Sequence, residues 1–337
     1  FGISCPSATA CFAVGSATVS GTTRRTLLRW TGTSWALVNA PVPSGTLSSV
    51  LDAVGCASAT ACLAVGFAQS ATTTQRLVLR WNGSTWTIAT TPLPTNTTAS
   101  YLYGVSCASA SACVAVGDAE IGGTSRPLAL RWNGTAWTAN LTPQPTGATY
   151  GDLYGVSCAT ATACTAVGYA TVAGTNRRQV LRWNGTTWTI VATPLPDGTT
   201  VSVLNGVDCP STTACVAVGS ATVGGTERRL VLRGNGTTWS TSTTPLPTGT
   251  TTSRLNAVSC TSASSCWVVG SAVVSGVRKR LVIRWNGTAW SLITAPIPAT
   301  ATSTEFFGVS CTSATACWAV GRAEITGASH QYVVRFT

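Results

Sequence analysis

The cysteines show the clearest chemical pattern in this sequence. Fourteen cysteines form seven Cys-x5-Cys pairs, and each pair follows the preceding one at an interval of 51 residues. The pairs are Cys5 and Cys11, Cys56 and Cys62, Cys107 and Cys113, Cys158 and Cys164, Cys209 and Cys215, Cys260 and Cys266, and Cys311 and Cys317. A five-residue turn lets the two sulfurs of a pair meet, so we predict seven disulfides. Zinc sites favour Cys-x2–4-Cys combined with a second such unit or with histidines, and the sequence has one histidine, His330. We therefore expect no metal and no other cofactor. Seven disulfides indicate an oxidising compartment, so we expect an extracellular or cell-surface protein.

Side chains suited to catalysis are sparse. The nine carboxylates are Asp52, Asp118, Glu120, Asp152, Asp197, Asp208, Glu227, Glu305 and Glu324. A glycosidase needs two carboxyl groups that face one pocket, and only Asp118 and Glu120 are near neighbours in sequence. A Ser-His-Asp triad has no support in a chain with one histidine, and the glycine-rich segments are turns of the repeat rather than phosphate-binding loops. We predict that the protein is not an enzyme.

Arginine carries nearly all of the positive charge. The net charge is +11, and Lys279 is the one lysine among 20 basic residues. One arginine of every repeat precedes a position that is usually tryptophan: Arg29, Arg80, Arg131, Arg182, Arg233, Arg284 and Arg335. We expect each of them to stack on a tryptophan of its own or a neighbouring repeat, with a ring of anion-binding arginines as the alternative.

A second set of residues lies on loops that differ between repeats. We take as the candidate binding face Arg25, Arg76, Arg126, Arg178, Arg229, Arg280, Tyr150 and Asp152. A basic rim of this kind suits an acidic polysaccharide or another anionic surface, and a neutral polysaccharide is a further candidate. Nucleic acid is not an expected partner, because basic and aromatic residues are not interleaved in a stripe. No stretch approaches the roughly 18 consecutive apolar residues of a membrane span.

The cysteine interval reflects a repeat of the whole sequence. Six repeats of 51 residues are followed by a truncated seventh, giving one domain built from residues 1–51, 52–102, 103–153, 154–204, 205–255, 256–306 and 307–337. Each complete repeat contains four strand signals and no helical period. In the third repeat we place these strands at residues 102–107, 113–119, 128–132 and 136–141. The Asn133-Gly134 pair between the last two strands predicts a type I′ turn with positive φ at both residues.

Seven copies of four short strands predict an all-β, seven-bladed β-propeller with one disulfide per blade. A β-solenoid is the alternative. Small residues of the first two strands suit the crowded centre of a ring, and leucine and tryptophan of the last two fill the wider gaps between blades. The cysteine hairpins and Asn-Gly turns share one face of this ring, and the remaining connections share the other. The seventh repeat lacks its fourth strand, which gives 27 strands and leaves one blade with an unpaired edge.

The motif G-V-S-C-x-S-A-x-A-C-x-A-V-G, together with W-N-G-T-x-W, resembles secreted repeat proteins of actinobacteria and similar bacteria over the entire chain. The R-W-N-G-T-x-W turn is more distantly similar to Asp-box and kelch-type propellers. Sialidases of that group need a clustered arginine triad, a Tyr–Glu pair and a catalytic aspartate, whereas the arginines here follow the repeat. The resemblance implies an extracellular propeller and brings no known chemistry with it.

Two functions follow from these features. In the first, the protein is a building block of a cell-surface or filamentous assembly, joined to copies of itself or to another surface protein by ring-to-ring or strand-edge contacts. The low charged fraction of 9 % and the open edge favour this interpretation. In the second, it is a lectin-like module that binds carbohydrate on the loop face. Repeated loop aromatics would support a lectin, but Tyr101, Tyr103, Tyr150 and Tyr154 cluster in only two repeats.

Seven asparagines stand in glycosylation sequons: Asn82, Asn96, Asn133, Asn140, Asn184, Asn235 and Asn286. Five of them belong to the repeated turn, where an asparagine that adopts positive φ is a structural alternative to a modified residue.

Overall fold

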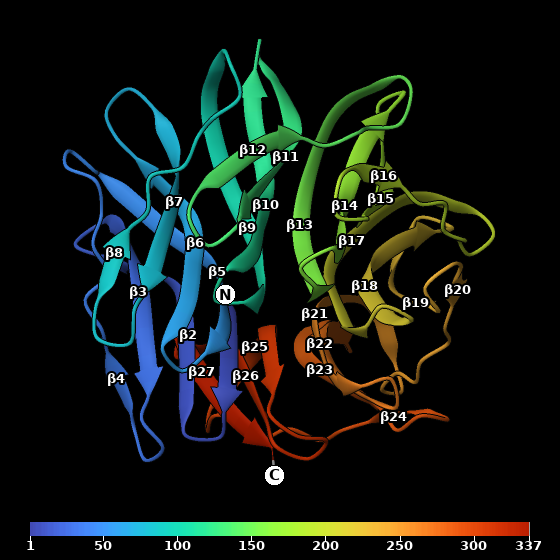
Figure 1. The fold of residues 1–337 in the computed structure, drawn as a ribbon. Helices are drawn as coiled ribbons and strands as arrows, with labels where there is room; N and C mark the ends of the chain where they lie inside the picture. The colour runs from blue at the N-terminus through green and yellow to red at the C-terminus, as the bar shows by residue number, and fades with distance from the viewer. Residues whose placement is uncertain (337) are drawn as a thin grey trace.

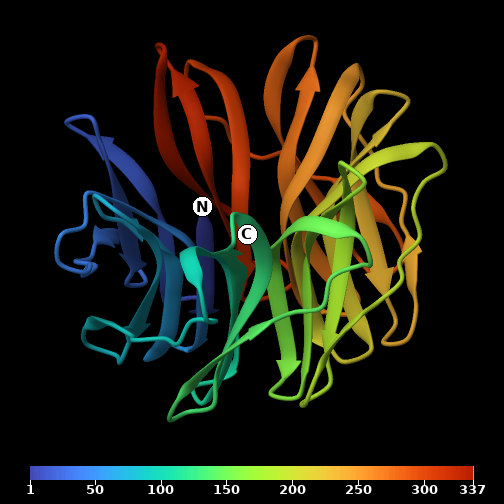
Figure 2. The same ribbon diagram turned by 90° about the horizontal axis from the view of Figure 1, so that it is seen from above.

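The computed structural model describes residues 1–336 of the 337-residue chain. Seven antiparallel sheets form a ring in chain order (Figures 1 and 2), which confirms the predicted propeller. Six sheets have four strands and the last has three, and residues 1–336 contain no helix. No segment of this part of the chain is therefore a helix able to span a membrane. We number the sheets as blades 1 to 7.

In each blade the first strand lies nearest the centre of the ring and the last strand lies at its rim. Blade 1 comprises β1 (Gly2–Ser7), β2 (Ala10–Val19), β3 (Thr22–Trp30) and β4 (Trp35–Leu37). Blade 2 comprises β5 (Ser48–Ser58), β6 (Ala61–Gln69), β7 (Thr74–Trp81) and β8 (Trp86–Ile88). Blade 3 comprises β9 (Thr97–Ser109), β10 (Ala112–Ile121), β11 (Thr124–Trp132) and β12 (Trp137–Leu141). Blade 4 comprises β13 (Ala148–Thr160), β14 (Ala163–Val172), β15 (Thr175–Trp183) and β16 (Trp188–Ile190).

The remaining blades repeat this order. Blade 5 comprises β17 (Thr199–Ser211), β18 (Ala214–Val223), β19 (Thr226–Gly234) and β20 (Trp239–Thr241). Blade 6 comprises β21 (Thr250–Ser262), β22 (Ser265–Val274), β23 (Val277–Trp285) and β24 (Trp290–Leu292). Blade 7 comprises β25 (Ala301–Cys311), β26 (Cys317–Ile325) and β27 (Ala328–Phe336). The first strands are longer than predicted: β9 begins at Thr97, which pairs with Ile121, because Thr-rich segments without apolar alternation still extend the ladder.

The core lies between neighbouring blades, so both faces of the middle strands are apolar. In β7, Leu77, Val78 and Leu79 are all at most 2 % exposed. Gly117 shows how tightly the inner strands are packed: a Cβ at this position would lie 2.0 Å from the carbonyl oxygen of Tyr101. The register between β10 and β9 shifts here, so the repeated Ala-Val-Gly segment needs glycine at a bulge.

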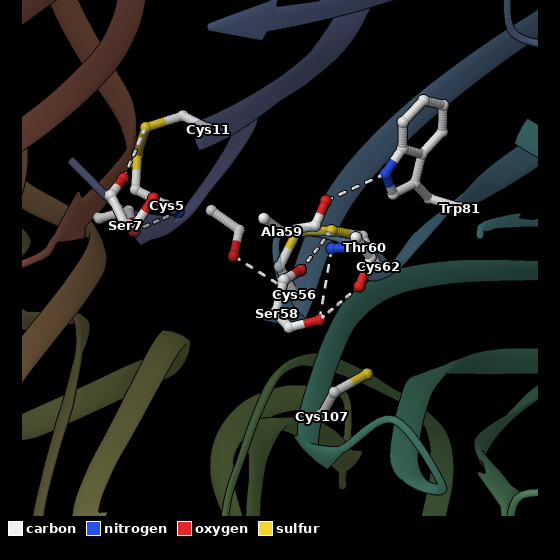
Figure 3. The surroundings of a disulfide bond; sticks show 12 residues. Cys5, Ser7, Cys11, Cys56, Ser58, Ala59, Thr60, Cys62, Trp81 and Cys107 are labelled. Atoms are coloured by element: carbon white, nitrogen blue, oxygen red, sulfur yellow. Dashed lines mark hydrogen bonds between the residues drawn. A yellow bond between two sulfur atoms is a disulfide. The ribbon is translucent and has the colours of Figure 1, made fainter. Parts of the chain in front are cut away.

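All seven predicted disulfides are present, and no cysteine among residues 1–336 is free. Figure 3 shows the Cys56–Cys62 bond, which closes the hairpin between β5 and β6. A hydrogen bond links each blade to the next in all but one case. Its acceptor is the side-chain oxygen of the residue before the first cysteine, and its donor is the backbone amide of the first cysteine of the next blade. The same bond closes the ring, since the backbone amide of Cys5 in blade 1 donates to Ser310 Oγ in blade 7 over 2.9 Å.

The Asn-Gly turn differs from our prediction. Trp132 pairs with Trp137, so the connection has four residues, and only Gly134 has positive φ, at 98°. The Asn133 side chain instead accepts hydrogen bonds from the backbone amides of Thr135 and Ala136, at 3.0 and 2.8 Å. The type I′ prediction was therefore wrong, because asparagine acts here as an acceptor that replaces backbone turn bonds.

The two kinds of turn share one face, as expected. The indole N–H of Trp81, which precedes the Asn82 turn, donates to the carbonyl of Ala59 in the cysteine hairpin over 3.1 Å (Figure 3). The opposite face carries the connections between second and third strands and between blades. We call it the loop face.

Candidate binding sites on the loop face and at the open blade

The arginines before the tryptophan position form contacts between blades or within one blade rather than an open anion site. Four of them stack on the tryptophan of the following blade: Arg29 on Trp81, Arg80 on Trp132, Arg131 on Trp183 and Arg233 on Trp285. Arg182 has no such ring to stack on, because its partner position is Gly234, and it donates to the carbonyl of Gly236. Arg284 and Arg335 stack on Trp267 and Trp318. The predicted stacking is therefore confirmed for six of the seven arginines, Arg182 being the exception.

Five arginines of the proposed binding face hold the connections between blades. The guanidinium of each donates to a backbone carbonyl 15 residues ahead in sequence. The pairs are Arg25 with Ala40, Arg76 with Thr91, Arg178 with Thr193, Arg229 with Thr244, and Arg280 with Ala295. Arg126 does not belong to this set. It is exposed, and the residue of blade 3 at the repeat position of these arginines is its neighbour Pro127. These carbonyl contacts give the arginines a structural role.

The loop face departs from the repeat at one pair of positions. In every complete first strand, one residue near the loop face pairs directly with a residue of the second strand, and the two differ from blade to blade. The pairs in blades 2 to 7 are Val50 and Phe67, Tyr101 and Asp118, Asp152 and Tyr169, Val203 and Ser220, Arg254 and Ser271, and Glu305 and Arg322. Polar and aromatic side chains therefore gather over blades 3 and 4, and charged ones over blades 6 and 7.

Aromatic rings of blades 2 to 4 form a continuous row. We call this row, together with the neighbouring Asp118, Ser125 and Asp152, the tyrosine–aspartate cluster. Neighbouring ring centroids are 5.1 to 6.3 Å apart along the series Phe67, Tyr101, Tyr103, Tyr154, Tyr169 and Tyr150. Five of the six tyrosines of the chain belong to it. Tyr150 is 40 % exposed and the other rings are half-buried. The aromatics that the sequence placed on loops lie on strands and converge in one place.

Two buried carboxyl groups lie beneath this row. Asp118 and Asp152 are 3 % and 4 % exposed, and Ser125 Oγ lies 2.9 Å from Asp118 Oδ2 and 2.8 Å from Asp152 Oδ1. A hydroxyl carries one hydrogen, so it satisfies only one carboxylate, and the other contact needs a protonated carboxyl group. Burial, followed by the charge of Asp152, raises the pKa of Asp118 to about 7, and burial also raises the pKa of Asp152.

The phenol groups complete the hydrogen bonding of Asp152. The hydroxyls of Tyr169 and Tyr154 donate to Asp152 Oδ2 over 3.1 and 3.4 Å. Burial, followed by the aspartate charges, raises the pKa of Tyr103, Tyr154 and Tyr169 above the ordinary tyrosine range. These groups therefore remain neutral donors, and the cluster presents aromatic faces and hydroxyls to the solvent above a buried acidic centre.

A second cluster lies on the other side of the ring. Glu305 is 3 % exposed, and one or other of its carboxylate oxygens lies 3.6 to 3.9 Å from guanidinium nitrogens of Arg254, Arg278 and Arg322. Ser271 and Asn256 donate to the same carboxylate over 3.1 and 3.3 Å. Because three positive charges surround one negative charge, this arginine–glutamate cluster keeps an excess of positive charge on the loop face.

The unpaired edge predicted from the repeat count is present in blade 7. Within residues 1–336, β27 pairs with β26 and with no other strand. A cleft of 860 Å³ lies between blades 7 and 1, and its lining includes Trp35 on one side and Arg322, His330 and Tyr332 on the other. Gln331 occupies the position of the carbonyl-binding arginines and donates instead to the carbonyl of Ser16 in blade 1.

The other predicted site residues have ordinary surroundings. The repeated-turn asparagines use their side-chain oxygen within the turn, as Asn133 does: Asn82, Asn184, Asn235 and Asn286. Asn96 has a φ of 63°, and Asn140 lies near the end of β12. Their use as glycosylation sites stays a prediction. Residues 1–336 contain no group of three or more histidine, cysteine, aspartate or glutamate side chains arranged to hold a metal ion.

Comparison with known proteins establishes the fold alone. No protein-family model matches the chain, and no curated protein matches it. Among solved structures, it is similar to YCF48 bound to D1 peptide (TM-score 0.55, 12 % identity, covering 99 % of this chain and 90 % of that one). YCF48 from Cyanidioschyzon merolae gives a TM-score of 0.56 at 11 % identity, covering 100 % and 94 %. An ulvan lyase of polysaccharide lyase family PL25 gives 0.62 at 10 % identity, covering 97 % and 90 %.

Proposed function

We propose that this protein is an extracellular, non-catalytic binding protein whose tyrosine–aspartate cluster binds a neutral glycan. The gathering of five of the six tyrosines in one row supports the proposal most strongly. The blade fold does not require these residues, because the corresponding positions of other blades carry side chains as different as valine, serine, asparagine, phenylalanine, arginine and glutamate. Ligand sites combine aromatic surface with a few well-placed polar groups, and partly exposed tyrosine faces above carboxylates and hydroxyls meet that description.

The charge of the site favours a neutral sugar over an acidic one. Asp118 and Asp152 lie beneath the rings, and Glu120 is half-buried nearby in β10. A carboxylate or sulfate of an acidic polysaccharide would be repelled here, whereas neutral hydroxyl groups gain hydrogen bonds from phenols and carboxylates. The excess of arginine lies in blades 6 and 7.

The geometry supports binding rather than hydrolysis or elimination. A retaining glycosidase places the sugar between carboxyl groups about 5 Å apart, but Ser125 Oγ occupies the space between Asp118 and Asp152. Elimination needs a base, and the raised pKa of Tyr154 and Tyr169 disfavours phenolate. Seven disulfides fit an oxidising environment, and the resemblance to secreted bacterial repeat proteins supports the extracellular location.

The test is a glycan array followed by calorimetry on the strongest neutral ligand. Tyr150→Ala removes the most exposed ring of the row, and Val201→Ala is its matched control, because Val201 holds the same position in blade 5 and is 37 % exposed. An aromatic contact contributes about 0.5–1.5 kcal/mol, so Tyr150→Ala weakens binding roughly 2- to 12-fold and Val201→Ala leaves it unchanged. Absence of glycan binding, or equal loss in both variants, contradicts the proposal. Release of reducing or unsaturated sugar ends would contradict the absence of catalysis.

A further inference from the structure

We propose that the arginine–glutamate cluster binds a phosphate monoester group at the loop face. The cluster consists of the buried Glu305 and the three arginines around it, Arg254, Arg278 and Arg322. It belongs to blades 6 and 7, whereas the tyrosine–aspartate cluster belongs to blades 2 to 4. The inference therefore does not rest on glycan binding by the tyrosine–aspartate cluster.

The packing of the blades does not require these charges. Arg278 and Glu305 lie at the interface of blades 6 and 7, and the corresponding residues between blades 1 and 2 are Thr23 and Val50. Arg254 holds the position of Val50 as well, one blade before Glu305. Neutral side chains therefore fill the same positions of the same fold, and packing gives no reason for three arginines around one carboxylate.

Neutral groups supply the hydrogen bonds of Glu305. Ser271 and Asn256 donate to its Oε1 over 3.1 and 3.3 Å. The guanidinium nitrogens of the three arginines lie 3.6 to 3.9 Å from the carboxylate oxygens, beyond ordinary hydrogen-bonding distance. Charge holds these arginines near Glu305, and the carboxylate does not occupy their donor groups.

The arginines lie between this carboxylate and the solvent. The Glu305 side chain is 4 % exposed, whereas the three arginine side chains are 36 to 50 % exposed. Arg254 and Arg278 both approach Oε1 of Glu305, so their guanidinium groups converge. The buried Nε of Arg254 has no partner, and Arg278 is oriented by Ser271, whose hydroxyl accepts from its Nη1 over 3.2 Å.

The charge of the cluster selects the class of ligand. Three guanidinium groups and one carboxylate leave two positive charges. A phosphate monoester carries close to two negative charges at neutral pH and three acceptor oxygens, and guanidinium donors match such oxygens in pairs. A carboxylate or a sulfate ester carries a single negative charge and is the weaker match.

Other carboxylates of blades 5 to 7 do not neutralise this excess. Asp208 accepts from the backbone amide of Cys260 over 2.6 Å, on the face of the cysteine hairpins. Glu227 and Glu324 form no ion pair within residues 1–336. The positive charge of the arginine–glutamate cluster is therefore available to a ligand.

The test is isothermal titration calorimetry of the non-reduced protein with glucose 6-phosphate at pH 7.5 and constant ionic strength. We expect saturable binding of one ligand per protein. Glucose 6-sulfate has the same sugar and one negative charge, so it should bind at least threefold more weakly. Inorganic phosphate distinguishes two sources of the group: an affinity equal to or above that of glucose 6-phosphate supports free phosphate as the ligand, and a lower affinity supports a phosphorylated sugar.

A pair of neighbouring substitutions separates this site from general charge attraction. Arg278→Thr introduces the residue that blade 1 has at this position, Thr23, so the fold tolerates it, and the loss of a charged donor should weaken glucose 6-phosphate binding at least tenfold. Lys279→Gln is the matched control. It removes the same charge at the next residue of β23, which is exposed and points to the other face of the strand, and blade 2 has Gln75 there. Its affinity should stay within twofold of the wild type.

Removing the carboxylate tests the charge argument in the opposite direction. Glu305→Gln raises the net charge of the cluster, so glucose 6-phosphate should bind at least threefold more tightly, which a purely structural role of the arginines would not produce. Circular dichroism checks that each variant remains folded.

Three outcomes overturn the proposal. The first is no saturable binding of glucose 6-phosphate or inorganic phosphate in the millimolar range. The second is equal affinity of Arg278→Thr and Lys279→Gln. The third is a Glu305→Gln variant that binds no more tightly than the wild type. Tyr150→Ala should leave phosphate binding unchanged, and Arg278→Thr should leave neutral-glycan binding unchanged, so failure of one proposal is distinguishable from failure of the other.

Discussion

Replacing Asp118 by asparagine is expected to remove part of the pH dependence of folding stability. Burial, together with the charge of Asp152, raises the pKa of Asp118 from 3.8 to about 7. Between these values the folded protein holds a proton that the unfolded chain releases, so this stability is present at acid pH and is lost as the pH rises through 7. One pKa unit corresponds to about 1.4 kcal/mol. The loss is therefore about 4 kcal/mol in total, of which about 3 kcal/mol fall between pH 5 and 8.

The assay is thermal unfolding by near-ultraviolet circular dichroism at pH 5, 6, 7 and 8 and constant ionic strength. For a chain of this length 1 kcal/mol shifts Tm by about 2 °C, so Asp118→Asn should lose roughly 5 °C less than the wild type over this interval. The difference between the two proteins is the relevant quantity, because the buried Asp208, whose pKa is also raised, acts in the same direction in both. Asp197→Asn, at an exposed carboxylate, is the control and should follow the wild type. Equal losses for wild type and Asp118→Asn would refute the shared-proton arrangement around Ser125.

Three further changes test the disulfides and inner-strand packing of the propeller and the arginine–glutamate cluster. Opening one disulfide with Cys56→Ser and Cys62→Ser should lower the free energy of unfolding by about 2 kcal/mol, as its short loop implies, in urea titrations under non-reducing conditions. Gly117→Ala should lower the free energy of unfolding by about 3 kcal/mol or more, because its Cβ would overlap the Tyr101 carbonyl. Gly122→Ala is the control, because Gly122 lies in an open turn with a φ of 60°. It should lower the free energy of unfolding by only about 1–2 kcal/mol in the same titration. Glu305→Gln leaves three arginines without their counter-charge and should cost about 2 kcal/mol, a loss that diminishes in 0.5 M salt; an equal loss at all salt concentrations would exclude the electrostatic account.

The sequence was sufficient to predict the propeller fold and its disulfides. The strict interval between cysteine pairs implies equal blades, and equal blades with four strands imply a ring, so the disulfides, the blade count and the open edge of β27 were all predictable. The arginine stacking was predictable in kind. Its direction, from Arg131 to Trp183 of the next blade, depends on how neighbouring sheets twist against each other, which no local pattern encodes.

The tyrosine–aspartate cluster was predicted only in part, through Tyr150 and Asp152, although the signal for the rest was present. Tyr103 and Tyr154 are separated by one repeat length, and residues one repeat apart stand at the same height on adjacent blades, so their contact follows once the ring is assumed. Asp118 and Asp152 do not share a strand, and they meet because Asp118 pairs with Tyr101, which stands one repeat before Asp152. Reading each repeat separately placed Asp118 beside Glu120 instead, and a comparison of aligned repeats would have found the correct partner.

Seven copies of one blade provide their own reference for what the fold requires. A position that carries the same residue in nearly every blade, such as the glycine at 117 or the cysteine pairs, has a packing reason that repeats with it. A position that changes from Asp118 to Tyr169 to Arg322 while the backbone stays the same has no such reason. The loop-face pairs are of this second kind. A binding function is expected at positions that vary between blades without a packing reason, which is why the tyrosine–aspartate cluster is the place to test first.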